Sequence, residues 1–364
     1  MKKPFVIILL AGLPLMAYRA FAGLGAVTAL TDIQPWGLVK AANIFTGAAL
    51  AAGSFTVAAC VYVLGIKRLK PLVPHALLMG FIGHGFVLTA LLYDVGRPLD
   101  VWRVVTNPQP HSALLWTAWC EAAYTTVMAV EIFGGARLER LKAPLAVVAA
   151  ALAVMYQSTL GTLFLASPHR ISSLWYSPSL PLQFLLSALA AGIGTLVIAT
   201  YLADRAGRRV FDIGYIKGAG WTMFALLAGM FALRLGDLFM GGGLTCTLPD
   251  CDGPAVRWYV AEVGFGTVLP AAMLLSGDVR RRRRGIAGVS ILVIFGVFMN
   301  RLGVTIIGWP HPAGVRYFPS ALEFLASGYF ILAAVTLYWH FDGRLAEKKS
   351  TQVEVQTPAV VSGE

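Results

Sequence analysis

The chain has 364 residues, of which 57% are hydrophobic and 13% are charged, and its formal net charge is +11. Apolar runs of about 20 residues recur along the sequence, and each is long enough to cross the hydrocarbon layer of a membrane as a helix. This pattern excludes a chain made of two soluble domains. The Lys and Arg residues lie mostly in short loops between these runs. The positive charge therefore reports membrane topology and does not indicate a nucleic-acid-binding surface.

Apolar runs bounded by charge, proline and glycine predict an all-α polytopic membrane protein with about ten transmembrane helices. The expected helices cover residues 4–30, 37–66, 75–95, 112–133, 143–165, 181–203, 215–240, 257–276, 286–307 and 318–340. The first run has the basic start of a signal peptide but continues without a convincing cleavage site, so we expect a retained helix. The membrane domain would span residues 1–342, and the polar residues 343–364 predict a disordered tail.

The loops on one side of this predicted bundle hold most of the basic residues, including the run from Arg280 to Arg284. Basic loops remain on the cytoplasmic side of a membrane. The bias therefore predicts that both termini and the tail are cytoplasmic. The arginine run is interpreted as a topology anchor that also contacts lipid headgroups.

The opposite loops carry tryptophan and tyrosine residues, as expected at a membrane interface. The loop richest in side-chain chemistry reads SPHRISSLWYSPSLP. We interpret it as one wall of a site and as a docking surface for a partner. The residues expected to form that surface are His169, Arg170, Trp175 and Tyr176.

The sequence contains four cysteines. Cys60 and Cys120 fall in predicted helices, where we expect them to be small buried hydrophobic residues. Cys246 and Cys251 share an outer loop and would close a disulfide in an oxidising compartment. A two-cysteine metal site would lack further ligands nearby, so no metal site is predicted.

Polar residues at membrane depth in the first half are candidates for chemistry, because burying ionisable groups in hydrocarbon is costly. Asn43 precedes Gly47 on one helix face, which gives a polar group beside a small-residue groove that would admit a helix or a flat ligand. The other candidates are His84, Asp94, Glu121, Tyr156 and Gln157. A buried histidine with carboxylates and amides on neighbouring helices favours a protonatable chain. Asp94 could instead pair with Arg97 to lock a helix end.

Five further ionisable residues fall at one level, in the outer third of the last four predicted helices. They are Arg234, Asp237, Glu262, Arg301 and Glu323. Their opposite charges could neutralise one another in a buried network that joins helices, or they could form a proton path. The sequence leaves both interpretations open.

Four segments, in their order and spacing, resemble one known family. They read WGLVKAANIFTGAALAAGSFT, LLYDVGRPLDVWR, YQSTLGTLFLASPHRISSLWYSPSLPLQF and NRLGVTIIGW. This pattern is similar to the NrfD/polysulfide-reductase membrane-subunit family, and most of all to the HybB-type membrane subunit of respiratory nickel-iron hydrogenases. The resemblance extends to about His340.

The resemblance implies two four-helix bundles, here about residues 37–165 and 181–307, with a flanking helix at each end. It implies a quinone-reactive subunit of the bacterial cytoplasmic (inner) membrane, without its own haem or metal. Such a subunit passes electrons between a periplasmic iron-sulfur ferredoxin-like subunit and menaquinone or another quinone, with linked proton transfer. Nickel-iron hydrogenase subunits are the expected source of electrons. The primary substrate site of the oxidoreductase complex would lie in those partners.

The resemblance also suggests roles for residues. Asn43, Gly47 and Tyr156 fall at positions expected near the quinone, although the family has histidine where this chain has Gly47. Depth and chemistry add Gln157 to the expected quinone-binding residues. The expected proton relay consists of Glu121, His84 and Asp94.

Two other functions are compatible with the composition. A haem-carrying cytochrome b-type anchor needs histidines paired across facing helices, and His75, His84 and His340 do not form a good pair by position. A secondary transporter needs broken helices and an internal repeat, and Pro14 and Pro270 interrupt the pattern only weakly.

Overall fold

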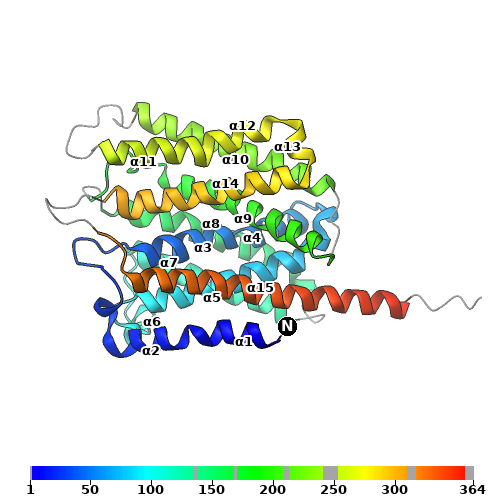
Figure 1. Cartoon of the computed structure of the whole chain (residues 1–364), viewed down its shortest axis with the longest axis horizontal. Coiled ribbons are helices and arrows are strands. Elements are labelled where there is room, and N and C mark those ends of the chain that lie inside the picture. Colours follow the sequence, from blue (N-terminus) through cyan, green and yellow to red (C-terminus); the bar gives the residue numbers. More distant parts are fainter. Residues whose placement is uncertain are drawn as a thin grey trace, which may run out of the picture.

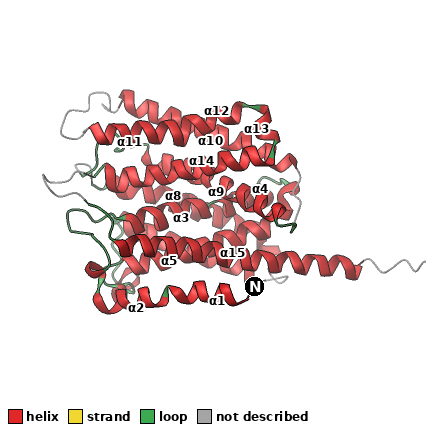
Figure 2. Ribbon diagram, in the orientation of Figure 1, coloured by secondary structure: helices red, strands yellow, loops and turns green. Residues whose placement is uncertain are grey.

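The structure is a computed structural model that describes residues 2–134, 138, 140–167, 170–208, 213–240, 253–309 and 317–356. Within these residues it contains helices and no strand (Figure 2). Nine of the described helical segments are long and apolar enough to cross a membrane. The prediction of an all-α polytopic membrane protein is confirmed.

Each predicted helix corresponds to a helical segment of the structure. The segments are α1 (Lys2–Ala11) with α2 (Leu13–Ala22); η2 (Lys40–Thr46), α3 (Gly47–Ala51) and α4 (Gly53–Tyr62); α5 (Val73–Asp94); α7 (Ala113–Phe133); α8 (Lys142–Leu165); α9 (Leu180–Arg205); α10 (Ile213–Met240); α11 (Gly253–Val263), η7 (Gly264–Val268) and α12 (Leu269–Leu275); α14 (Arg283–Leu302) with η8 (Gly303–Ile307); and α15 (Ala321–Gln356). Short helices lie between them: η1 (Leu24–Ala26), η3 (Lys67–Leu72), η4 (Pro98–Asp100), α6 (Arg103–Thr106) and α13 (Gly277–Arg281).

Two predicted boundaries differ from the structure. The first helix, expected to reach residue 30, ends at Ala22, because Gly23 adopts a φ of 83°, a value that terminates a helix. At the other end, α15 continues to Gln356, beyond the boundary expected at residue 342. The final turns of this last helix project beyond the bundle, at the end where the N-terminus lies (Figure 1).

The long helices lie side by side, and α9 and α14 connect the two halves of the chain (Figure 1). α9 packs on α3, α4 and α8 of the first half and on α10 and α14 of the second. Glycines allow the closest approaches: a methyl group on Gly53 of α4 would collide with the backbone of Gly192 in α9, and one on Gly266 with Gly296 in α14. Small residues at helix contacts are typical of membrane bundles. The division into two four-helix bundles stays a prediction.

Three described segments are π-helical: η2, η7 and η8. A π turn inserts one residue into an α-helix and is frequent at functional sites. Asn43 lies inside η2, Glu262 lies just before η7, and Arg301 lies just before η8. Polar residues that the sequence singled out therefore lie at irregular points of their helices.

Candidate functional site

The centre of the first half contains a buried histidine-glutamate pair. His84 on α5 and Glu121 on α7 are each only 1% exposed. The Nδ1 atom of His84 lies 2.9 Å and 3.0 Å from the two carboxylate oxygens of Glu121. An ionised carboxylate only accepts hydrogen bonds, so Nδ1 donates to it. The other ring nitrogen of His84, Nε2, is buried and has no hydrogen-bond partner.

Two tyrosines border this pair. The ring of Tyr124, also on α7, meets the His84 ring edge to face at 4.7 Å, and the ring of Tyr156 on α8 lies 5.8 Å from it. The Tyr156 hydroxyl also forms a side-chain hydrogen bond with Glu121. Glu121 is thus held between an imidazole, which can carry a proton, and a phenol that donates a hydrogen bond to it.

We use the name first-half cluster for Asn43, His84, Glu121, Tyr156 and Gln157. The structure brings His84 into contact with Glu121 and Tyr156, and the two amides lie on α8 and on η2, which packs on α5. Gln157 donates from Nε2 to the carbonyl of Ala48 at 3.0 Å, while its Oε1 is buried without a partner. The Nδ2 atom of Asn43 is likewise buried and unpartnered. Unpaired buried polar atoms are costly, so these groups are suited to a ligand or to water.

The small-residue groove beside Asn43 is filled by a helix. A methyl group on Gly47 would lie 3.4 Å from a side-chain carbon of Val87, on α5. The sequence allowed either a neighbouring helix or a flat ligand in this groove. At Gly47 the occupant is the helix α5.

Asp94 lies at the end of α5, and its partner is not Arg97, the residue that the sequence analysis considered. It forms a buried ion pair with Lys40, the first residue of η2, whereas Arg97 is exposed. Arg19 donates to the backbone carbonyls of Tyr93, at 2.6 Å, and Val95, and so holds the C-terminus of α5. Asp94 is ten residues from His84, roughly 15 Å along the helix, and stands apart from the first-half cluster.

The five-residue layer expected in the second half is divided in the structure. Glu323 accepts hydrogen bonds from the backbone N–H groups of Ala29 and Ser320, at 3.0 Å and 2.9 Å, and from the hydroxyl of Tyr317. It therefore joins α15 to the chain after α2. Burial, and then the hydrogen bond to Glu323, raise the pKa of Tyr317, which lies outside the helix, above its ordinary value.

Arg234, Glu262 and Arg301 do assemble, and with Asn300 and Trp175 they form what we call the second-half network. Arg234 Nη2 lies 2.6 Å from one oxygen of Glu262, and Asn300 Nδ2 donates to the same oxygen at 2.8 Å. The indole of Trp175 donates to the other oxygen at 2.9 Å. Glu262 thus accepts from three donors.

Arg301 is completely buried, at 0% exposure, and extends the network to α9. It donates to the Asn300 side chain at 2.6 Å and to the hydroxyl of Ser187 at 2.8 Å. Its guanidinium also lies 3.5 Å from the centre of the Phe184 ring, a favourable cation–π arrangement.

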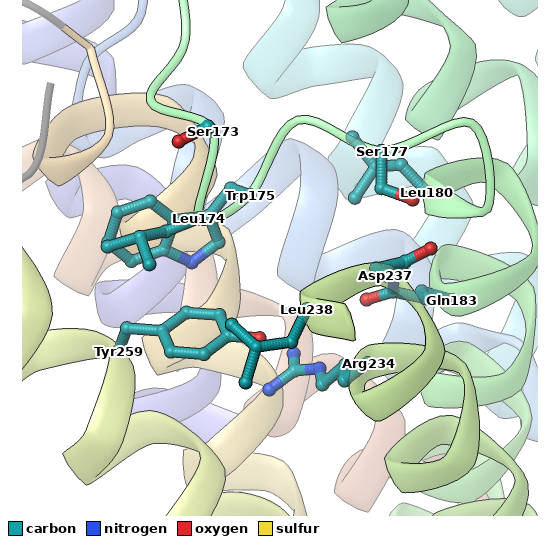
Figure 3. Close-up of a pocket in the computed structure, with 10 residues that line it drawn as sticks. All are labelled: Ser173, Leu174, Trp175, Ser177, Leu180, Gln183, Arg234, Asp237, Leu238 and Tyr259. Carbon is teal, nitrogen blue, oxygen red and sulfur yellow. Dashed lines mark hydrogen bonds between the residues drawn. The ribbon is translucent and has the colours of Figure 1, made fainter. Parts of the chain in front are cut away.

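Asp237 lies beside the network, in a small outer cavity. It accepts from Ser179 at 2.6 Å and from Gln183 at 2.7 Å. Figure 3 shows Trp175 and Tyr259 along one side of the cavity and Asp237 next to Gln183 on the other. The volume of about 10 Å³ is close to the room that one water needs.

The residues expected to form the docking surface differ in their exposure. Arg170 is exposed and Tyr176 is half-buried, with its hydroxyl 3.5 Å from the carbonyl of Leu165. Trp175 is only 4% exposed and points into the second-half network. His169, like Cys246 and Cys251, lies outside the described residues. Cys60 and Cys120 are free thiols, and Cys120 is buried.

The helix-borne histidines each have a partner other than a second histidine. His75 lies 2.9 Å from Asp342, His84 binds Glu121, and His340 stacks on the Phe5 ring with centroids 4.3 Å apart. Among the described residues, no group of three or more His, Cys, Asp or Glu could hold a metal ion. The residues that the structure describes do not fit an axial pair for haem.

The sequence analysis missed several polar residues that bind the predicted ones: Lys40, Ser179, Gln183, Ser187 and Asn300. Asn300 directly precedes Arg301, and Lys40 precedes Asn43 by three residues, so their positions near other candidates were a usable signal. Serines and a glutamine near a helix start give no comparable signal.

Comparison with known proteins relates this chain to one family of membrane subunits. Residues 26–311 match the family model described as polysulphide reductase, NrfD. A protein of Nitratidesulfovibrio vulgaris without a descriptive name is 32% identical over 362 residues, covering 93% of this chain and 92% of the relative.

Two relatives have informative names. The probable Ni/Fe-hydrogenase 2 b-type cytochrome subunit of Escherichia coli is 28% identical, over 89% of this chain and 86% of its own length. The menaquinone reductase integral membrane subunit of Nitratidesulfovibrio vulgaris is 26% identical, over 85% of this chain and 83% of its own length.

Proposed function

This chain belongs to the NrfD family of polysulphide reductase, and from that membership we propose that it is the quinone-reactive membrane subunit of a respiratory oxidoreductase complex. A relative of similar length is named as the membrane subunit of a menaquinone reductase. We take menaquinone, or a similar quinone, as the substrate of the first-half cluster.

The observation that carries this proposal is the set of unpaired polar atoms in that cluster. His84 Nε2, Gln157 Oε1 and Asn43 Nδ2 are buried without partners. A quinone offers carbonyl oxygens that accept hydrogen bonds, and a quinol offers hydroxyls that donate them. The Asn43 amide suits the first, Gln157 Oε1 suits the second, and His84 Nε2 suits either, according to its protonation.

Reduction of a quinone to a quinol requires two electrons and two protons. The His84–Glu121 pair is suited to deliver protons, because an imidazole and a carboxylate in direct contact can exchange one. Tyr156 holds Glu121 from the other side. Asp94, which is ion-paired with Lys40 at the end of α5, stays a proposed proton carrier. It is separated from the pair by roughly 15 Å along the helix, so water would have to bridge the two.

The electron donor in this proposal is a periplasmic iron-sulfur subunit. The E. coli relative is named as a hydrogenase subunit, so a nickel-iron hydrogenase is the proposed source of electrons here. Exposed Arg170 and half-buried Tyr176 lie on the loop that we assign to docking. We assign both termini to the cytoplasm and the chain to the bacterial inner membrane, because basic loops remain on the cytoplasmic side.

Replacement of Glu121 by Gln tests the proposal. The amide preserves shape and hydrogen bonding but cannot relay a proton, so quinone turnover by the assembled complex should fall roughly 10²-fold or more. Glu131, a half-buried carboxylate ten residues further along α7 and so roughly 15 Å from Glu121, provides the matched control: Glu131→Gln should retain turnover. Unchanged turnover in Glu121→Gln would remove the pair from the reaction.

A further inference from the structure

A basic pocket lies far from both clusters, at the end of the bundle where the N-terminus lies (Figure 1). Its volume is about 180 Å³, and it opens between the start of α10 and the short helix α13. The residues that line it are Lys217, Trp221, Gly277, Arg280 and Arg281.

The backbone explains why this corner is concave. Ser276 and Arg282, on either side of α13, have extended conformations, with ψ values of 124° and 126°. The chain therefore turns twice between α12 and α14, and α13 forms a separate short helix that packs beside α10. Gly277 lines the hollow, and a methyl group there would meet open space.

Arg280 is fixed at the wall of the pocket. Its guanidinium lies 3.9 Å from the centre of the Trp221 ring and donates a hydrogen bond to the carbonyl of Leu274. Gly220 makes room for it, since a methyl group there would come within 3.2 Å of the Arg280 side chain. A guanidinium held in this way keeps its remaining N–H groups available for a ligand in a set direction.

The pocket carries an excess of positive charge. Lys217 and Arg281 are exposed and, among the described residues, take part in no ion pair. The carboxylate of Asp204 is engaged by Arg283 at 2.8 Å. Asp278, which is exposed on α13, is the acidic residue next to the basic run. Three cations against one free carboxylate favour an anionic ligand.

The pocket also borders an apolar surface. Trp221 is 51% exposed, one helical turn beyond Lys217, and Leu275 is 56% exposed at the end of α12. Val268 and Leu269 continue the exposed apolar surface along η7 and α12. Tryptophan at this depth is typical of the interface between headgroups and acyl chains. A free phosphate ion would not contact these apolar side chains. The acyl chain of a phospholipid would bury them.

We propose that this pocket binds the phosphate headgroup of an anionic phospholipid. Lys217, Arg280 and Arg281 contact the phosphate, and an acyl chain lies along Trp221 and Leu275. Basic pockets between membrane helices at this level are suited to such headgroups. The site is independent of the quinone reaction, and it gives the arginine run a specific ligand in addition to its effect on topology.

The test compares two variants of equal charge. Lys217→Gln/Arg281→Gln removes two cations from the pocket and leaves the anchored Arg280 in place. Arg282→Gln/Arg284→Gln removes two cations from the same loop but from outside the pocket. All four side chains are at the surface or only partly buried, so both proteins should fold. Native mass spectrometry of the purified full chain, titrated with phosphatidylglycerol in detergent, measures the affinity of the bound lipid.

We expect the pocket variant to bind phosphatidylglycerol about thirtyfold more weakly than the wild type, and the control to stay within about threefold of it. Equal losses in both variants would show attraction by the whole basic loop and would overturn the site. If both variants kept the wild-type affinity for phosphatidylglycerol, the proposed site would also be overturned.

A second arm separates the lipid from free phosphate. Phosphatidylcholine, which has no net charge, should not replace phosphatidylglycerol, and inorganic phosphate at millimolar concentration should not displace it. Displacement by inorganic phosphate would assign the pocket to a soluble anion and contradict a lipid occupant.

Discussion

Among the residues that the structure describes, Glu121 of the first half and Glu262 of the second are both buried between helices, and they are held in opposite ways. Glu121 and Glu262 are each 1% exposed. Glu262 accepts from a guanidinium, an amide and an indole, so its negative charge is compensated and its lone pairs are occupied. Glu121 contacts an imidazole and a phenol, and its neighbours include atoms without partners.

The difference separates two uses of a buried carboxylate. An arginine guanidinium keeps its positive charge in proteins, so it gives a neighbouring carboxylate a fixed counter-charge. The second-half network therefore joins α9, α10, α11 and α14 as a fixed connection. A carboxylate paired with histidine can share a proton, because the histidine changes charge near neutral pH. Of the two interpretations that the sequence left open for the second-half charges, this arrangement favours the connection between helices.

The largest expected effect comes from breaking that connection. Glu262→Gln leaves the buried Arg234 without a counter-charge, and removal of one partner of a buried ion pair typically costs about 3–5 kcal/mol. The midpoint of thermal unfolding in detergent should therefore fall well below that of the wild type. Glu121→Gln, the same chemical change in the other half, should shift it little. Similar losses in both variants would remove the distinction between the two glutamates.

A smaller effect is expected from the loop that closes the network. Trp175→Phe keeps the ring but removes the N–H group that donates to Glu262 at 2.9 Å. A hydrogen bond to a charged group contributes about 1.5–3 kcal/mol, so thermal stability should fall by less than in Glu262→Gln, with quinone turnover retained. A loss of turnover at unchanged stability would instead place Trp175 in electron transfer from the partner.

The smallest effect concerns the amides. Gln157→Leu removes the side chain whose Oε1 is unpartnered in the first-half cluster. Loss of one hydrogen bond, worth about 0.5–1.5 kcal/mol, should weaken the binding of a quinone analogue by about two- to thirteenfold. Gln183→Leu, in the second half, should bind the analogue as the wild type does. Fluorescence titration with the analogue measures both. Equal affinities in the two variants would exclude Gln157 from the quinone contact.

The sequence was informative about which residues lie at membrane depth and less so about which of them meet. Helix positions follow from apolar runs, and depth follows from the rise along each helix. This was enough to select His84 and Glu121, which the structure brings into contact. The same reasoning grouped Glu323 with Arg301, although α15 turns Glu323 toward Ala29 instead.

The partners could not be predicted because pairing depends on how each helix is rotated and on local irregularities. The π turn of η2 helps to set the direction of Lys40 and Asn43, and no periodicity argument anticipates an inserted residue. Trp175 belongs to a loop that folds back over the bundle, so its place at an outer membrane interface did not reveal an inward contact.

The central claim, that the quinone reacts in the first half and the second half serves as the connection between helices, is tested most directly by a photoreactive azidoquinone. Illumination of the complex with this probe, followed by peptide mapping, identifies the helices at the quinone headgroup. We expect label on η2, α5, α7 and α8, and loss of that label in the presence of excess menaquinone analogue. Label on α10, α11 or α14 that the analogue displaces would contradict the account.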